Sequence, residues 1–320
     1  MSVLSSPYFH DEAKAFEYLE SIVWAGGVVC PHCGVVGDRV YDLSGVRGKP
    51  SAKSPEGALR YGLKKCGECR KQFTVKVGTV FEHARMPLHK MLQAVHLIAS
   101  SKKGISSHQL HRILEVQYKT AWFLAHRIRE AMRSGDLAPF GAGGGIVEVD
   151  ETFIGNLKGR ERGRAYHHKM KVLALVDRDS GKARTMVVDG VSAKTLVPIV
   201  VANIAREATV MTDEHHAYTH LGDHFTRHGT TNHKSGEYVN LEDRTIHSNT
   251  VEGYFSIFKR GMKGIYQHCS EQHLHRYLAE FEFRYNNRQA NGIDDRGRAR
   301  EAIKGITGKR LTYTRPDLNA

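Results

Sequence analysis

The chain alternates between stretches in which apolar residues recur every three or four positions and stretches in which they alternate or run together. The first pattern predicts helices, which cover residues 11–24, 87–101, 106–114, 119–133, 194–205, 247–260 and 270–287. The second pattern predicts strands, which cover residues 72–81, 147–154, 171–178, 183–190 and 208–213. We expect residues 72–81 to form a hairpin. The order strand, strand, strand, helix, strand after residue 147 predicts a mixed α/β domain.

Three carboxylates lie on these predicted elements at positions that suggest a functional role. Asp150 is in the middle of a predicted strand, although Asp is rare in strands and costly among apolar neighbours. Asp213 ends another strand, where sites form in open α/β sheets. Glu252 lies near a helix start, where a carboxylate often only compensates the helix dipole. Together, three hard oxygen ligands suit two magnesium ions acting on a phosphate.

Four of the five cysteines form two Cys-x-x-Cys pairs, Cys30 with Cys33 and Cys66 with Cys69. Two such pairs separated by a loop predict one tetrahedral zinc site of the zinc-ribbon type, and the alternatives are redox pairs or unrelated thiols. Four thiolates would fill the coordination shell, so we expect a structural ion. Cys269 is expected to be a buried free thiol.

The net charge of the chain indicates the kind of partner that it binds. Lys and Arg outnumber Asp and Glu by 47 to 34, which gives a net charge of +13. This excess favours a polyanionic partner, most often nucleic acid. No apolar run reaches the length of a membrane span and no signal peptide opens the chain. Cysteines without an export signal indicate a reducing cytoplasm. We therefore expect a cytoplasmic protein that is not bound to membranes.

Basic residues gather in three places that are candidates for contact with DNA. The predicted helices 106–114 and 119–133 form a helix-turn-helix pattern, whose second helix we expect to present arginines to solvent or phosphate. Residues 155–171 hold six Lys or Arg against one Glu, and they form either a solvated loop or a grip on the DNA backbone. Two basic residues also follow Glu252 by two helical turns. The candidate DNA contacts are Lys158, Arg160, Arg162, Arg127, Arg129, Lys259 and Arg260.

Two longer stretches carry a specific resemblance to a known family. They are HSNTVEGYFSIFKRGMKGIYQH, from His247, and HLHRYLAEFEFRYNNR, which ends at Arg288. With the three carboxylates and the paired cysteines, they resemble the DDE transposases of insertion sequences, in the zinc-ribbon, ISXO-type branch (family fifteen-ninety-five). The resemblance covers most of the chain, from about Phe16 to Arg288. It implies an RNase H-like catalytic domain that uses two Mg²⁺ (or Mn²⁺) ions.

The resemblance also implies roles for individual residues. Asp150, Asp213 and Glu252 would bind the two ions, with Asn249 and His247 in support and Lys259 in contact with DNA. Asn249 is an alternative third ligand, but two divalent ions favour the charged Glu252. The reaction would be cleavage and strand transfer by direct transesterification. The partners would be the terminal inverted repeats and target DNA, with the protein acting as a homodimer or higher oligomer on the nucleoid.

We therefore expect a multidomain α+β protein. Its parts are a zinc ribbon with an N-terminal helix (residues 1–82), a helical helix-turn-helix-like region (83–138), an RNase H-like domain (146–290) and a loose basic tail (291–320). Two other functions fit the same sequence. One is a nuclease of the same fold that cannot join DNA ends. The other is a zinc-ribbon transcription regulator without catalysis, whose carboxylates are incidental.

Overall fold

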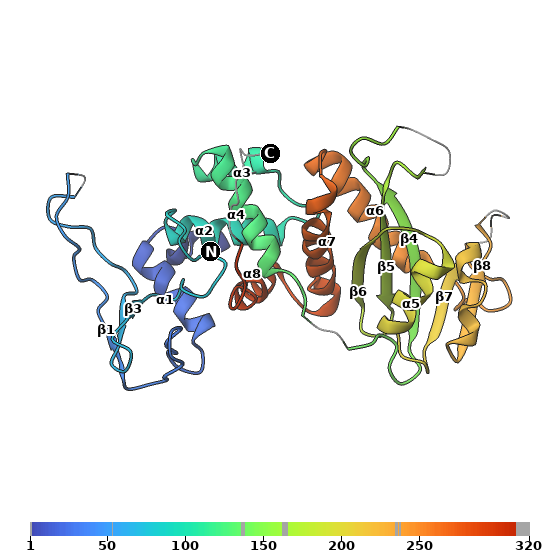
Figure 1. Cartoon of the computed structure of the whole chain (residues 1–320), viewed down its shortest axis with the longest axis horizontal. Helices are drawn as coiled ribbons and strands as arrows, with labels where there is room; N and C mark the ends of the chain where they lie inside the picture. Colours follow the sequence, from blue (N-terminus) through green and yellow to red (C-terminus); the bar gives the residue numbers. More distant parts are fainter. Residues whose placement is uncertain are drawn as a thin grey trace. The chain divides into compact units, whose positions relative to one another are not determined.

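The computed structural model describes residues 2–52, 54–135, 138–161, 166–233, 236 and 238–311. The chain divides into two compact units (Figure 1). The first unit contains the residues up to Ser101, Ile105–Met132 and the chain from Ile293 onwards. The second unit contains Lys102–Gly104 and Arg133–Gly292.

The first unit contains a small three-stranded antiparallel sheet. Its strands are β1 (Val40–Asp42), β2 (Lys64–Cys66) and β3 (Gln72–Phe73), in the order β1-β2-β3. The sheet has a small core of its own, in which Cys30, Cys66 and Phe73 are buried together. Too few apolar side chains gather here for a stable hydrophobic core alone, so a bound metal is the expected reinforcement.

The rest of the first unit is helical, and all its helices except the last form where the apolar periodicity predicts them. They are α1 (Glu12–Val23), α2 (Leu88–Ser100), α3 (Ser107–Leu114), α4 (Tyr118–Ala131) and α8 (Asp295–Lys304). Side chains cap three of them: Asp11 accepts a hydrogen bond from Lys14 N at 2.8 Å, Ser106 accepts one from Gln109 N at 3.1 Å, and Asp294 accepts one from Gly297 N at 2.7 Å. The predicted helix pair α3 and α4 is in contact, and α2 contacts α8.

Two predictions for this unit are wrong, and they share a cause. Residues 72–81 do not form a hairpin, because only Gln72–Phe73 is a strand and it pairs with β2. The predicted loose tail instead contains α8, after which Val80 N donates to Ile306 O at 3.0 Å and Thr79 bridges to Thr307. The two segments satisfy each other's backbone groups, and neither partner can be recognised from local sequence.

The second unit is built on a five-stranded mixed sheet. Its strands are β4 (Ile146–Ile154), β5 (Met170–Asp177), β6 (Lys182–Val188), β7 (Thr209–Asp213) and β8 (Arg227–Thr231), in the order β6-β5-β4-β7-β8. Strands β4, β5 and β6 are antiparallel neighbours, whereas β7 lies parallel to both β4 and β8. Strand β8 was not predicted because its sequence, RHGTT, has no apolar alternation.

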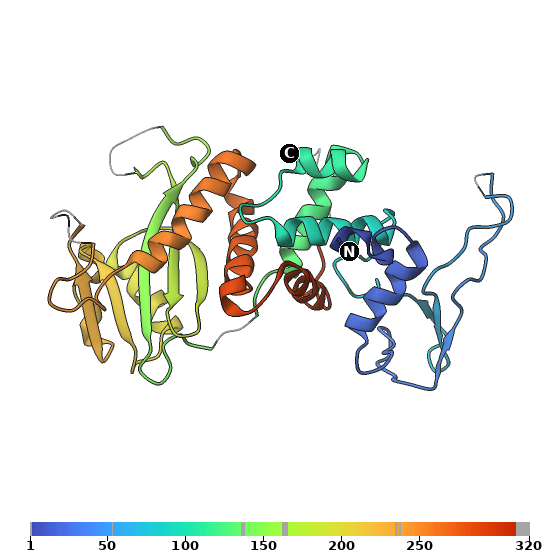
Figure 2. The same cartoon turned by 180° about the vertical axis from the view of Figure 1, so that it is seen from behind.

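Helices cover both faces of this sheet. Leu196 and Val200 of α5 (Ala193–Asn203) are buried in one core with Val147 and Val149 of β4. The core on the opposite face joins the alternate positions of β4 and β5, such as Ile154 and Val172, to α6 (Asn249–Gly261) and α7 (Glu271–Asn286). Figure 2 shows α6, in orange, lying across the strands, and α6 contacts both β4 and β5. Because side chains alternate along a strand, Glu148 and Asp150 lie on the α6 face of β4.

The packed chain of this unit begins before residue 146. Phe140 is buried in the α5 core, bridges to Ile204 and lies 4.6 Å beneath the Arg184 guanidinium. The predicted start of this domain at residue 146 is therefore too late, because Phe140 already belongs to its core.

Candidate active site and zinc centre

The four paired cysteines converge in the first unit. The Sγ atoms of Cys30 and Cys69 are 3.7 Å apart, and those of Cys33 and Cys66 are 3.6 Å apart. Tetrahedral coordination with Zn–S bonds of about 2.3 Å places sulfurs about 3.8 Å apart, so the spacing fits one zinc ion. Within the described ranges, this is the one group of three or more His, Cys, Asp or Glu residues whose ligand atoms all lie within 4.8 Å of one another.

In the second unit, the sheet register brings Asp150 and Asp213 to the same level. Glu148 pairs with Met211 in the parallel ladder of β4 and β7, and the two aspartates each lie two residues further along. Asp213 is the last residue of β7, where its Oδ1 accepts a hydrogen bond from His215 N at 3.0 Å. Asp150 accepts from Glu151 N at 2.7 Å.

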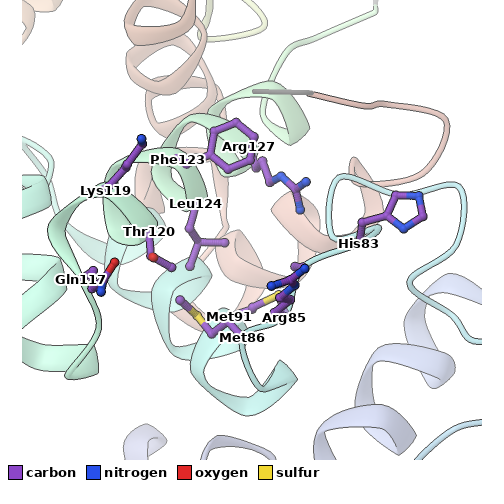
Figure 3. Close-up of a pocket in the computed structure, with 11 residues that line it drawn as sticks. His83, Arg85, Met86, Met91, Gln117, Lys119, Thr120, Phe123, Leu124 and Arg127 are labelled. Atoms are coloured by element: carbon purple, nitrogen blue, oxygen red, sulfur yellow. The ribbon is translucent and has the colours of Figure 1, made fainter. Parts of the chain in front are cut away.

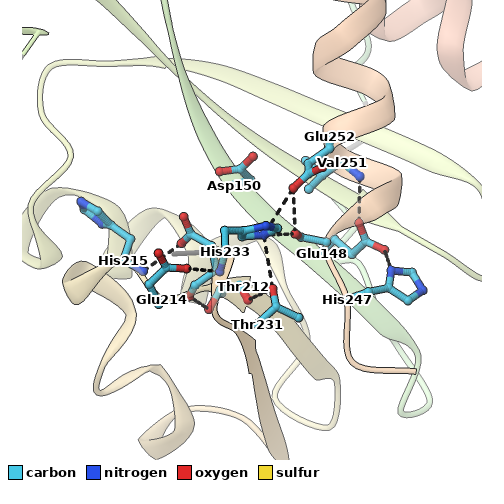
Figure 4. Close-up of polar contacts among 12 residues, drawn as sticks. Glu148, Asp150, Thr212, Glu214, His215, Thr231, His233, His247, Val251 and Glu252 are labelled. Carbon is cyan, nitrogen blue, oxygen red and sulfur yellow. Dashed lines mark hydrogen bonds and ion pairs between the residues drawn. The ribbon is translucent and has the colours of Figure 1, made fainter. Parts of the chain in front are cut away.

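Glu252 reaches this site from the first turn of α6, and Figure 4 shows it on the same side of β4 as Asp150. Its Oε1 lies 3.3 Å from His233 Nε2 and accepts a hydrogen bond of 3.4 Å from Ser248 Oγ. The side chain remains 41% exposed, so it can reach a ligand. Val251, Phe255 and Phe258 form the apolar stripe of this helix and are buried.

Electrostatics link the three carboxylates. Burial raises the pKa of Asp150 well above its usual value, and the charges of Glu151, Asp213 and Glu252 raise it further. Holding these groups ionised together is unfavourable without a cation. The structure therefore brings together the three predicted carboxylates, although more widely spaced than ligands around a single ion.

The predicted supporting residues are placed differently from one another. His247 contacts Glu148 and Arg178 rather than Glu252, with its Nδ1 at 3.3 Å from Glu148 Oε1. Asn249 is exposed as the first residue of α6. Lys259 Nζ lies 5.8 Å from the centre of the Phe255 ring, on the face of α6 that carries Glu252. Arg260 is exposed and bonds Ser256.

Several residues of the site were missed in the sequence. His233 follows β8 and contacts Glu252. Tyr218 donates a hydrogen bond of 2.6 Å to Glu151, the neighbour of Asp150, on the other face of β4. Glu148 and Arg178 form a buried pair beneath α6. A second acid two residues before Asp150 was the available signal for Glu148, since both side chains share one strand face.

The predicted DNA contacts outside α6 differ in how exposed they are. Lys158 and Arg160 are exposed after β4, and Arg162 lies outside the described residues. Arg127 is partly buried and donates to Glu82 O at 3.0 Å. The prediction that Arg129 faces solvent or phosphate is wrong, because its side chain is 1% exposed. Other helices of the first unit pack around α4, so more of its circumference is buried than its pattern indicates.

A cavity of about 280 Å³ lies beside the start of α4 (Figure 3). Met86, Met91, Phe123 and Leu124 form its apolar part. Its basic lining residues are Arg85, Lys119 and Arg127. Arg127 is thus shared between this cavity and the Glu82 carbonyl.

Comparisons with known proteins match two separate parts of the chain to two domains. Residues 10–72 match the model of a transposase zinc-ribbon domain, and residues 143–286 match that of an ISXO2-like transposase domain. The chain is also 30% identical over 300 residues to an uncharacterized protein in transposable element ISH50 of Halobacterium salinarum, covering 86% of this chain and 91% of that protein. The two matched domains are those of an insertion-sequence transposase. The chain belongs to the family that joins a zinc-ribbon domain to an ISXO2-like transposase domain.

None of the helices that the structure describes is both long and apolar enough to cross a lipid bilayer.

Proposed function

We propose that this transposase cleaves the ends of its mobile element and joins them to target DNA, using Asp150, Asp213 and Glu252 to hold two Mg²⁺ or Mn²⁺ ions. The observation that carries the proposal is the convergence of these carboxylates on the α6 side of the sheet, where burial and mutual repulsion raise the pKa of Asp150. An RNase H-like arrangement is supported by the strand order, with three antiparallel strands followed by two parallel ones.

The three carboxylates fit a site for two divalent metal ions. All three are carboxylates, the ligand type that Mg²⁺ prefers, and Asp150 is held where a cation relieves repulsion. Spacing wider than a single-ion site is compatible with two ions about 3.5–4 Å apart. When bound, the ions supply positive charge that activates the attacking oxygen and stabilises the leaving oxygen.

The chain's own groups position the DNA and hold the carboxylates. Lys259 projects from the same face of α6 as Glu252, where a compact ammonium suits a phosphate. Water attacks the phosphorus, the bond to the 3′ oxygen breaks, and a free 3′ hydroxyl remains. In the second step this hydroxyl attacks a target phosphate, the bond from that phosphorus to the target's 3′ oxygen breaks, and the element end is joined while the target keeps a free 3′ hydroxyl. Neither step needs a covalent protein–DNA intermediate.

The first unit would bind the terminal inverted repeats through its zinc ribbon and the α3–α4 pair. Arg127 is its partly exposed arginine on α4, and the exposed Lys158 and Arg160 would hold the backbone near the cut. Two ends must be joined in one event, so we propose a homodimer or higher oligomer on DNA.

A strand-transfer assay with pre-cleaved element ends tests this function. Joined products in Mg²⁺ are expected. Cleavage of uncut ends without any joining would indicate a nuclease of the same fold. Absence of metal-dependent nicking on any supercoiled DNA would favour a non-catalytic zinc-ribbon regulator.

A further inference from the structure

Glu148 is an acidic residue at the site that the proposed chemistry does not use. It is the third residue of β4, its side chain is 0% exposed, and it shares the α6 face of the strand with Asp150. Both of its carboxylate oxygens already accept hydrogen bonds from the protein. Oε1 accepts from Arg178 Nε at 2.6 Å, and Oε2 accepts from Val251 N at 2.8 Å. A carboxylate occupied in this way is not a free metal ligand.

The bond to Val251 N fixes the start of α6. The first N–H groups of a helix have no partner within the helix and need one from outside. Ser248, the residue before α6, makes no capping hydrogen bond with its side chain. Glu148 supplies an acceptor from another element, and its charge is favourable at a helix N-terminus. Val251 directly precedes Glu252, so the contact restrains the turn that carries the metal-binding carboxylate (Figure 4).

Arg178 completes the anchor from the end of β5. Its guanidinium donates to Thr245 O at 2.6 Å and to His247 O at 2.7 Å, besides Glu148. Its Nη2 also lies 2.9 Å from His247 Nδ1. These bonds hold the chain that enters α6 while they compensate the buried charge of Glu148, which would otherwise be costly.

We propose that Glu148 is a positioning residue for catalysis, which acts with Arg178 to hold the first turn of α6 against β4 so that Glu252 faces Asp150. This inference rests on the proposed function, because it assigns Glu148 an effect on metal binding through Glu252. The strand that carries Asp150 and the helix that carries Glu252 are joined by one buried side chain. Loss of that link lets Glu252 move, and small displacements of a ligand are expensive in affinity and rate.

The test compares Glu148→Gln with a matched control, Glu280→Gln, in the full-length protein. Glu280 is equally buried and also pairs with an arginine, Arg284, but it lies on α7. Binding of Mn²⁺ is measured directly by titration, beside thermal unfolding and DNA cleavage. We expect Glu148→Gln to weaken Mn²⁺ binding about 10–100-fold, with cleavage recovering at saturating Mn²⁺. Glu280→Gln should bind Mn²⁺ like the wild type even if it unfolds at a similar temperature.

A second variant keeps the experiment decisive if Glu148→Gln does not fold. Arg178→Lys retains the positive charge but loses the planar donors that reach the chain before α6, and it should also weaken Mn²⁺ binding. Equal Mn²⁺ affinity in Glu148→Gln and Glu280→Gln overturns the inference and leaves the proposed function standing. If Glu148→Gln does not fold, equal Mn²⁺ affinity in Arg178→Lys and the wild type has the same meaning. Wild-type protein that binds no Mn²⁺ and cuts no DNA removes both.

Discussion

Asp150 holds its carboxyl group where ionisation is unfavourable. Burial and three acidic neighbours raise its pKa, so the folded protein retains this proton at a pH where the unfolded chain has lost it. Stability therefore falls as pH rises from the unfolded pKa of about 3.9 towards the raised folded value. A bound divalent ion reverses this penalty by pairing with the charge.

We predict that Asp150→Asn raises the unfolding temperature of the metal-free protein by a few degrees near neutral pH, since the amide carries no charge to repel. Added Mn²⁺ should raise the unfolding temperature of the wild type, and it should raise the unfolding temperature of the variant much less. Thermal unfolding with and without Mn²⁺ measures both effects. Asp223→Asn is the control, because that side chain is 76% exposed. A destabilised metal-free Asp150→Asn would contradict the electrostatic argument.

At this scale the sequence pointed to the proposed metal-binding carboxylates more readily than to the groups that position them. Asp150 and Asp213 are conspicuous because acids are rare in apolar strands. Glu148 is equally conspicuous, but its partners Arg178 and Val251 lie 30 and 103 residues away along the chain. A role defined by tertiary hydrogen bonds cannot be inferred from local spacing.

At the scale of elements, helix α7 covers most of the second stretch that resembles the family, the one that ends at Arg288, and its polar side chains have a structural role. Asn286 on α7 accepts from Ala183 N at 2.7 Å and donates to Ala183 O at 2.9 Å, and Glu282 accepts from Thr185 N at 2.8 Å. These bonds satisfy the outer edge of β6, the last strand on that side of the sheet. Open strand edges invite pairing with other chains, so the helix protects the sheet.

We expect Asn286→Ala to destabilise the protein by ~1–3 kcal/mol, because it leaves a partly buried backbone donor and acceptor without partners. Urea unfolding measures this change. Gln272→Ala is the control on the same helix, where the side chain is exposed. Equal unfolding midpoints for the two variants would show that the strand edge is satisfied by other means.

The small sheet β1–β3 is also an element whose folding we expect to depend on its bound zinc. We expect Cys66→Ser to release zinc and unfold residues around β1–β3, because binding energies of ~10–16 kcal/mol are coupled to folding in small zinc modules. Metal analysis and proteolysis of the purified variant measure this. Cys269→Ser should retain zinc, since Cys269 lies in the second unit. Well-folded wild-type protein without zinc would refute the assignment.

Across elements, periodicity predicted the bounds of α1 to α7 to within about two residues, because each buries one continuous face, but it missed α8. It failed where pairing partners are distant. Strand β8 is polar and held by β7, and residues 79–80 are satisfied by residues 306–307. Such contacts are decided by the folded chain rather than by local pattern.

For the whole molecule, the net charge of +13 is the feature that bears on DNA. We expect neutralising Lys158, Arg160 and Arg162 together to reduce the salt dependence of DNA binding by up to about 2–3 in log–log slope, at ~0.9 per lost phosphate contact. A charge-conserving triple, with Lys158→Arg, Arg160→Lys and Arg162→Lys, should keep the slope. Affinity measured across a salt series compares them. An unchanged slope in the neutral triple would remove this segment from the interface.

The most direct measurement of the central claim is cleavage of labelled element ends in Mg²⁺ and in Mn²⁺ by wild type, Glu252→Gln and Asn249→Ala, with DNA binding measured in parallel. Glu252 carries the charge that divalent ions require, whereas Asn249 is an exposed neighbour one turn earlier. The account predicts that Glu252→Gln binds DNA but does not cut it, and that Asn249→Ala still cuts, about 10–100-fold more slowly. Cleavage by Glu252→Gln together with none by Asn249→Ala would contradict it and make Asn249 the third ligand.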